Sequence, residues 1–146
     1  MKNIIKNSLL YFIFFTSTIT LTTQFYDNDH IIELKNKDEL QNLLKNNLGP
    51  CLIYFYMNNC GWCSKIGPII EELSQSKQFL HAITFYKVNG PQTQAAELVP
   101  EYLQKKIQGY PTIFFMNKGE LFDTQVGGAN KETMITKLQA LLKVSQ

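Results

Sequence analysis

Apolar and polar positions follow two different periods along residues 30–146, and this change of period predicts strands and helices that alternate. Residues 52–57 (LIYFYM) are apolar at every position apart from the tyrosine hydroxyls, which is typical of a central strand covered on both faces. Asn117-Lys118-Gly119 is a turn signal that predicts a hairpin from the strands beside it. The expected strands are residues 30–34, 52–57, 82–88, 112–116 and 121–126.

Leucine and isoleucine recur at helical spacing between these runs, which predicts the helices. Asn36 with Glu39 three residues later is a capping box, and it predicts a helix that begins there and reaches about residue 46. The other expected helices cover residues 60–77, 93–107 and 130–142. Pro68 should bend the first of these three, and Pro100 should interrupt the second. The pattern predicts one α/β domain with a central mixed sheet flanked by helices.

The first 26 residues have a different character. Lys2 and Lys6 are followed by no charged side chain until Asp27, and an apolar run extends from about residue 9 to residue 21. This layout is typical of a secretory signal, and about 20 Å of helix is too short for a hydrocarbon core of roughly 30 Å. No A-x-A cleavage site is present, so an uncleaved anchor stays open. We expect residues 1–24 to be a signal peptide or membrane anchor and residues 25–146 to be an exported, periplasmic or otherwise extracytoplasmic domain.

Composition narrows the choice of partners. The chain has 146 residues, 45% of them hydrophobic, which suits one folded domain rather than a disordered chain. All 14 basic residues are lysine, so the guanidinium fork that recognises phosphate and guanine is missing and nucleic-acid binding is not expected. Without Lys2 and Lys6, 12 lysines face 12 acidic residues, and the exported part is formally neutral.

The candidate chemistry lies in Cys60-Gly61-Trp62-Cys63, at the expected start of a helix. Two cysteines at this spacing can close a disulfide across one turn. The unpaired N–H groups and dipole of the helix start then stabilise a thiolate on the first sulfur. We therefore expect Cys60 to be the attacking nucleophile and Cys63 to be the resolving thiol.

The three cysteines also allow other interpretations. An inert structural disulfide between Cys60 and Cys63 stays open. No metal is expected because a second pair of this spacing is missing, and Ser64 stands where haem attachment would need histidine. Cys51 is expected to be a small buried apolar side chain at a strand start, with an intermolecular bond as the alternative.

With this motif the chain resembles the thioredoxin superfamily over about residues 30–145. The matching positions are a helix-kinking proline, a strand lysine, the cis-proline loop and a glycine after the last strand, namely Pro68, Lys87, Tyr110-Pro111-Thr112 and Gly127. The resemblance implies a thioredoxin-like fold, a cis bond before Pro111 and a redox-active Cys60–Cys63 pair. It also implies that Trp62, Tyr110 and Pro111 bind substrate, that Gly61 and Lys87 support the site, and that no cofactor takes part.

One departure from the family bears on the mechanism. Tyr54 stands six residues before Cys60, where the family carries a buried acid that takes the proton of the resolving thiol. A phenol with an ordinary pKa of about 10 is a poor base near neutrality. Proton transfer at Cys63 must then use water, Lys87 or an acid that the sequence alone does not locate. The segment from residue 89 to residue 111 is also a few residues longer than in small thioredoxins, which can affect partner choice.

The dipeptide Gly61-Trp62 carries no cation to stabilise the thiolate, and this favours a reductase or a mid-potential exchanger over a strong oxidant. The expected partners are disulfide-containing exported proteins and a membrane-bound or soluble thiol that supplies or accepts electrons. Two alternatives stay open. One is a disulfide oxidase or isomerase in oxidative folding, and the other is a redox-silent adaptor that binds clients beside Tyr110 and Pro111.

Overall fold

The computed structural model describes residues 30–47 and 49–146, so the expected leader over residues 1–24 lies outside it. Five strands and four helices make up the described part. In chain order they are β1 (Ile31–Leu34), α1 (Lys37–Asn46), β2 (Cys51–Tyr56), α2 (Gly61–Gln75), β3 (Thr84–Asn89), α3 (Ala95–Leu103), β4 (Thr112–Asn117), β5 (Glu120–Val126) and α4 (Lys131–Val144).

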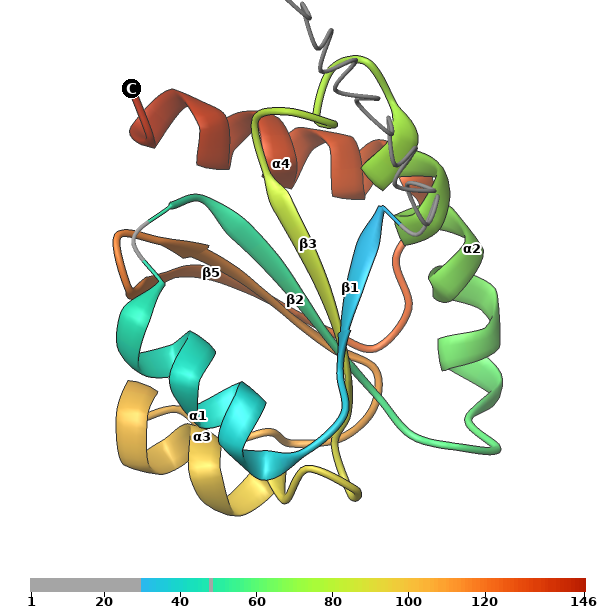
Figure 1. Cartoon of the computed structure of the whole chain (residues 1–146). Coiled ribbons are helices and arrows are strands. Elements are labelled where there is room, and N and C mark those ends of the chain that lie inside the picture. The colour runs from blue at the N-terminus through green and yellow to red at the C-terminus, as the bar shows by residue number, and fades with distance from the viewer. Residues whose placement is uncertain (1–29, 48) are drawn as a thin grey trace, which may run out of the picture.

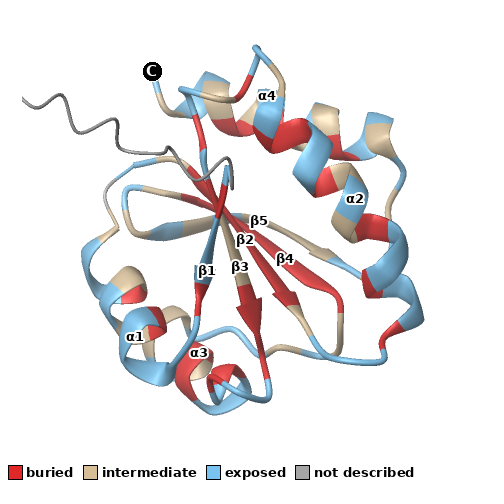
Figure 2. Cartoon of the chain, turned by 45° about the vertical axis from the view of Figure 1, so that its right-hand side comes forward, coloured by how far each residue is buried: buried red, intermediate tan, exposed pale blue. Residues whose placement is uncertain are grey.

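The strands form one sheet in the order β1-β3-β2-β4-β5 (Figure 1). β1, β3 and β2 are parallel, whereas β4 runs antiparallel to β2 and pairs with β5 in the expected hairpin. β2 and β4 are almost entirely buried (Figure 2), as the apolar run over residues 52–57 predicted for a central strand. The predicted α/β fold with a central mixed sheet is confirmed.

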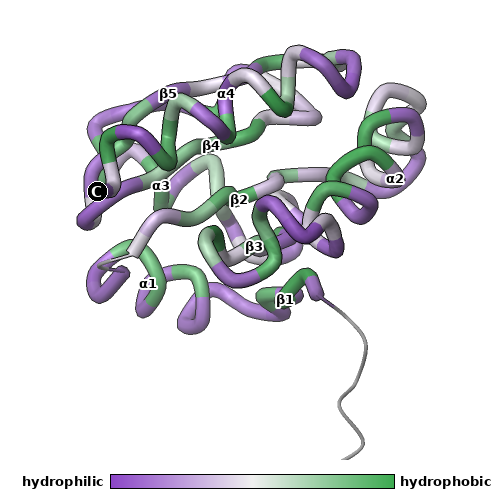
Figure 3. Tube along the Cα trace, turned by 90° about the horizontal axis from the view of Figure 1, so that it is seen from above, coloured by the Kyte–Doolittle hydropathy of each residue, from purple (hydrophilic) through white to green (hydrophobic). Residues whose placement is uncertain are grey.

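Helices cover both faces of this sheet. The side chains of Leu52 and Tyr54 on β2 pack with α2 and α4, while those of Ile53 and Phe55 pack with α1 and α3. Figure 1 shows the same two helix layers on either side of the strands. Along the helices, hydrophobic positions alternate with hydrophilic ones (Figure 3), as expected for helices with one buried face. Two separate apolar cores therefore hold the sheet in place.

The predicted start of the first helix is confirmed, whereas the predicted length of the third helix is wrong. Asn36 accepts a hydrogen bond from the N–H of Glu39 at 2.9 Å and begins α1 as expected. The helix expected over residues 93–107 is shorter, because Gln94 and Gln104 both adopt left-handed backbone angles that end it at Ala95 and Leu103. Pro100 lies inside α3 and does not interrupt it, which corrects that prediction.

The strand expected over residues 82–88 begins two residues later, at Thr84. The N–H groups of Ala82 and Ile83 both donate to the carbonyl of Phe79, each at 3.0 Å. These donors are used in a turn that closes the end of α2, so they cannot join the sheet. An apolar pattern alone does not distinguish the end of such a turn from the start of a strand.

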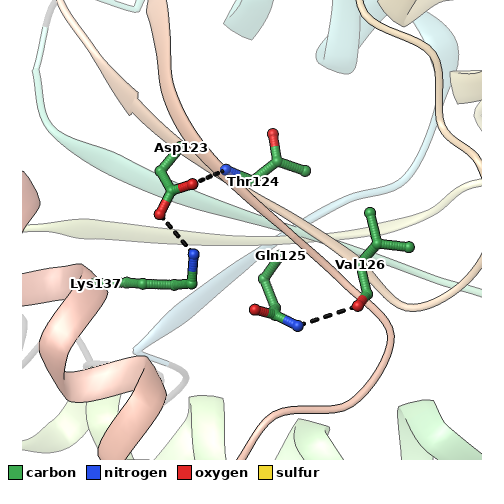
Figure 4. A network of polar contacts seen from close by, with 5 residues as sticks. All are labelled: Asp123, Thr124, Gln125, Val126 and Lys137. Atoms are coloured by element: carbon green, nitrogen blue, oxygen red, sulfur yellow. Dashed lines mark hydrogen bonds and ion pairs between the residues drawn. The ribbon is translucent and has the colours of Figure 1, made fainter.

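The last helix is fixed to the edge strand β5 by a polar contact (Figure 4). The carboxylate of Asp123 accepts from the backbone N–H of Thr124 at 2.7 Å and pairs with Nζ of Lys137 at 2.6 Å. Lys137 comes from α4, and its ammonium also lies 5.7 Å from the centre of the Phe115 ring. This contact holds α4 against the hairpin of β4 and β5.

Cys51 is fully buried at the start of β2, as predicted, and burial raises the pKa of its thiol to about 12 despite a hydrogen bond from Asn47. The unfolded thiol loses its proton near pH 9, whereas the folded thiol keeps it to about pH 12. Stability present below pH 9 is therefore lost as the pH rises towards 12, by up to about 1.4 kcal/mol per pH unit.

We predict that Cys51→Ala removes this part of the pH dependence. The measurement is the urea unfolding free energy of the oxidised protein at pH 8.0 and 10.5, comparing slopes rather than absolute values. Equal slopes in the wild type and the variant would show that the thiol ionises as readily in the folded state.

Candidate redox-active site

The sheet topology gathers the candidate residues at one edge. β2 and β3 are parallel and β4 is antiparallel to them, so the ends of β2 and β3 lie beside the beginning of β4. The chain leaves β2 at Tyr56 and enters α2 at Gly61, which places both cysteines at this edge. Pro111 lies at the beginning of β4, and Gly127 follows the end of β5. Residues more than 60 positions apart in sequence thus meet.

The cysteines form a disulfide whose Cα atoms are 5.2 Å apart. Cys60 is the N-cap of α2, and the backbone N–H of Cys63 donates to its Sγ at 3.1 Å. The first sulfur therefore lies at the helix N-terminus, as predicted, where donors and the helix dipole stabilise a thiolate. The two residues are only 8% and 6% exposed, so a partner must approach them through a defined opening.

The proline loop faces the first sulfur. The Tyr110–Pro111 bond is cis, which confirms the prediction, and Sγ of Cys60 lies 3.6 Å from the carbonyl oxygen of Tyr110. The N–H of Gly127 donates to the carbonyl of Pro111 at 2.8 Å, and Gly127 itself has a φ of +76°, which suits glycine. This bond holds the loop against the chain that leaves β5.

The side chain of Tyr110 lies against Gly90, just after β3. A methyl group on Gly90 would overlap the ring and hydroxyl of Tyr110. Gly90 is fixed in turn by its N–H, which donates to the carbonyl of Tyr56 at 2.8 Å. Gly90 therefore makes room for the residue that precedes the cis-proline.

Trp62 is the most exposed large hydrophobic side chain in the described part of the chain, at 60%. Its ring lies over Gly128, where an added Cβ would come within 2.6 Å of it. Nζ of Lys65 lies 4.5 Å from the ring centre, within cation–π range. The indole is thus held in place beside the cysteines while much of its surface stays exposed. Contact with a substrate remains a prediction for Trp62, Tyr110 and Pro111.

A hollow of about 330 Å³ opens beside the disulfide and is lined by both cysteines together with Tyr54, Tyr56 and Lys87. The hydroxyl of Tyr54 donates to the carbonyl of Cys63 at 3.0 Å. Burial first, and then the neighbouring Tyr56, raises the pKa of Tyr54 to about 12. Tyr54 therefore keeps its proton at neutral pH and acts as a donor, not as a base.

Lys87 lies where the resemblance placed it, at the hollow, and it also pairs with Glu33 of β1 at 3.7 Å. The same carboxylate accepts a hydrogen bond from the hydroxyl of Tyr56 at 2.7 Å. Burial, followed by this hydrogen bond and the charge of Glu33, raises the pKa of Tyr56 to about 12, while a hydrogen bond with Asn89 lowers it. An acid thus stands close to the hollow, although it comes from another strand.

Three of these positions were not singled out from the sequence. Glu33 lies within the expected strand over residues 30–34 and belongs to no motif, and Gly90 and Gly128 carry only the general signal of glycine in a loop. Glycines after strands can mark a close approach of another group, but the approaching ring is not visible in sequence. Over residues 30–47 and 49–146, no group of three His, Cys, Asp or Glu side chains could hold a metal ion.

The similarities to known proteins agree with this geometry. A family model described as Thioredoxin matches residues 31–140. A thioredoxin of Mycoplasmoides gallisepticum is 37% identical over 110 residues, covering 75% of this chain and 97% of that protein. A thioredoxin of Pseudomonas aeruginosa is 26% identical over 113 residues, covering 77% and 97%. The crystal structure of Malassezia sympodialis thioredoxin matches with a TM-score of 0.64 at 25% identity, covering 77% of this chain and 90% of that one.

The fold and the paired cysteines define a thiol–disulfide exchange protein. The chain belongs to the thioredoxin family and is a thioredoxin-type thiol–disulfide oxidoreductase. Within the residues that the structure describes, no helix has the length and apolar character needed to cross a membrane.

Proposed function

We propose that this protein reduces or exchanges disulfides of exported proteins through Cys60 and Cys63. The observation that carries the proposal is the position of Sγ of Cys60, which lies 3.1 Å from the N–H of Cys63 and 3.6 Å from the carbonyl of Tyr110. The first contact stabilises the thiolate. The second places the sulfur beside a backbone segment that can pair with an extended client in the manner of an added strand.

The reaction needs two exchange steps. The Cys60 thiolate attacks one sulfur of a client disulfide, so that a mixed disulfide forms and the other client sulfur leaves as a thiolate. Cys63 then loses its proton and attacks Sγ of Cys60, which releases the second client sulfur. The client gains two electrons and the protein is left with the Cys60–Cys63 disulfide, the state seen in the structure.

The proposal that the clients are exported rests on the first 26 residues, in which two lysines precede an apolar run. Exported compartments are oxidising, so continued reduction there requires a membrane-bound or soluble thiol that returns the pair to the reduced state. No electrostatic attraction to clients is needed, because the exported part is formally neutral.

The direction of transfer is tested by equilibrating the protein with glutathione buffers and measuring the potential of the Cys60–Cys63 pair. We expect a value near about −270 mV, typical of a reductase, because no cation lies between the cysteines. Cys60→Ser should show no such equilibrium and should not reduce insulin in the presence of dithiothreitol. A potential above about −200 mV would instead favour the oxidase or isomerase alternative.

A further inference from the structure

The second exchange step needs an acceptor for the proton of Cys63. The thiol of Cys63 must lose a proton before it can attack Sγ of Cys60. Tyr54, which donates to the Cys63 carbonyl, keeps its own proton because its pKa is raised to about 12. Tyr56 lines the same hollow and is unsuited for the same reason. The proton must therefore go elsewhere.

Glu33 is the carboxylate that the strand order brings to this place. β1 pairs with β3, and the register sets Glu33 opposite Lys87, so their side chains project to the same face of the sheet. The Glu33 carboxylate lies 3.7 Å from Nζ of Lys87 and accepts from the hydroxyl of Tyr56 at 2.7 Å. Lys87 and Tyr56 both line the hollow that contains the two cysteines.

The environment of this carboxylate suits exchange of a proton with water. The side chains of Lys87 and Glu33 are 30% and 39% exposed, so solvent reaches both. An ion pair this exposed adds little to the stability of the fold, so a stabilising role does not account for its place beside the hollow. The hollow of about 330 Å³, which is lined by the cysteines and by Lys87, has room for several waters.

We propose that Glu33, held by Lys87 and Tyr56, receives the proton of the Cys63 thiol through water in the hollow during the second exchange step. This inference rests on the proposed function. The Cys63 sulfur forms a bond to Sγ of Cys60, the bond from Cys60 to the client breaks, and the client leaves as a thiolate. The proton on the Glu33 carboxylate then passes to solvent or to that thiolate. Since Glu33 acts through water and its neighbours, it is a positioning residue rather than a catalytic one.

Among the described residues, Glu33 contacts two titratable groups of the hollow, Lys87 of β3 and Tyr56 of β2. The other titratable groups that line the hollow are Tyr54 of β2 and the two cysteines at the start of α2. Both phenols stay neutral across the range in which the step would be measured. The two phenols therefore do not contribute to the pH profile of the resolving step.

The test separates the two steps with dithiobis(nitrobenzoate) as the probe. The reduced protein releases one nitrothiobenzoate when Cys60 attacks and a second when Cys63 resolves the mixed disulfide, and stopped-flow absorbance resolves the two phases between pH 5.5 and 9. For Glu33→Gln we expect the first phase to stay within about twofold of wild type. The second phase should slow by at least about tenfold at pH 7 and become proportional to hydroxide concentration. Glu33→Asp should recover part of the rate.

Glu72→Gln is the matched control, because Glu72 is also an exposed acid paired with a lysine, Lys131, at 2.6 Å. It should change neither phase. An unchanged or faster second phase in Glu33→Gln would overturn the inference, and so would equal slowing of both phases, which would indicate a structural role. If the wild type releases no nitrothiobenzoate in either phase, the proposed function itself fails, so the two failures are distinguishable.

Discussion

Replacing Cys63 with alanine is expected to stop the reaction at its midpoint and to leave client proteins bound covalently to Cys60. Cys60 keeps the N-terminal position of α2, so the first attack proceeds. The mixed disulfide then lacks the internal thiol that lies one helical turn away, and only dilute external thiols can resolve it. Because a well-placed internal group can act at very high effective concentration, turnover should fall by about 10³-fold or more. The adducts are measured on non-reducing gels of the native host and identified after reduction.

The same experiment tests which clients the protein serves. We expect the trapped clients to be exported proteins with disulfides, and the double variant Cys60→Ser/Cys63→Ala should form no adducts. Adducts made only with cytosolic proteins would contradict the proposed compartment. Undiminished client capture by the double variant would instead support a redox-silent adaptor.

The second large effect is expected for Gly90→Ala. The added methyl group would overlap the ring of Tyr110, and the carbonyl of Tyr56 fixes the Gly90 backbone from the other side. The overlapping atoms lie at the far end of the Tyr110 side chain, so its ring must shift to admit the methyl group. Overpacking of this kind costs about 1–3 kcal/mol, and we expect a destabilisation within this range, together with slower insulin reduction.

Gly49→Ala is the control for this change, since an added Cβ at Gly49 meets nothing within 4 Å. The double variant Gly90→Ala/Tyr110→Ala should recover much of the lost unfolding free energy, because removing the ring removes the overlap. The measurement is the free energy of unfolding in urea of the wild type, the two single glycine variants and the double variant. Stability of Gly90→Ala equal to that of Gly49→Ala would show that the loop adapts without cost.

The sequence predicts the layers of this fold well because its signals there are local. The side chain of Asn36 caps a helix that begins at the next residue, and the apolar run of β2 forms a strand over its own length. Both predictions are confirmed. The boundaries of α3 were missed because Gln94 and Gln104 adopt left-handed backbone angles. Glycine or asparagine at these positions would indicate such angles, whereas glutamine does not. The cis bond before Pro111 came from the resemblance and not from local propensity.

The supporting residues of the site could not be predicted because their contacts depend on strand order. Glu33 meets Tyr56 across 23 positions of sequence, and the contact exists because β3 lies between β1 and β2 in the sheet. The sequence did show that Tyr54 stands where the family carries an acid. It could not show that an edge strand brings the Glu33 carboxylate to Lys87 and Tyr56, which line the hollow, since an alternation pattern fixes the face of a side chain but not its neighbour.

The central claim is that electrons pass between a client disulfide and the Cys60–Cys63 pair. Its most direct test is a single turnover in which fully reduced protein is mixed with excess insulin and no other reductant, quenched in acid, alkylated and mapped by mass spectrometry. We predict one insulin disulfide opened per chain, a bond between Cys60 and Cys63, and an alkylated Cys51. Intact insulin disulfides with both active-site thiols alkylated, or a new bond through Cys51, would contradict the account.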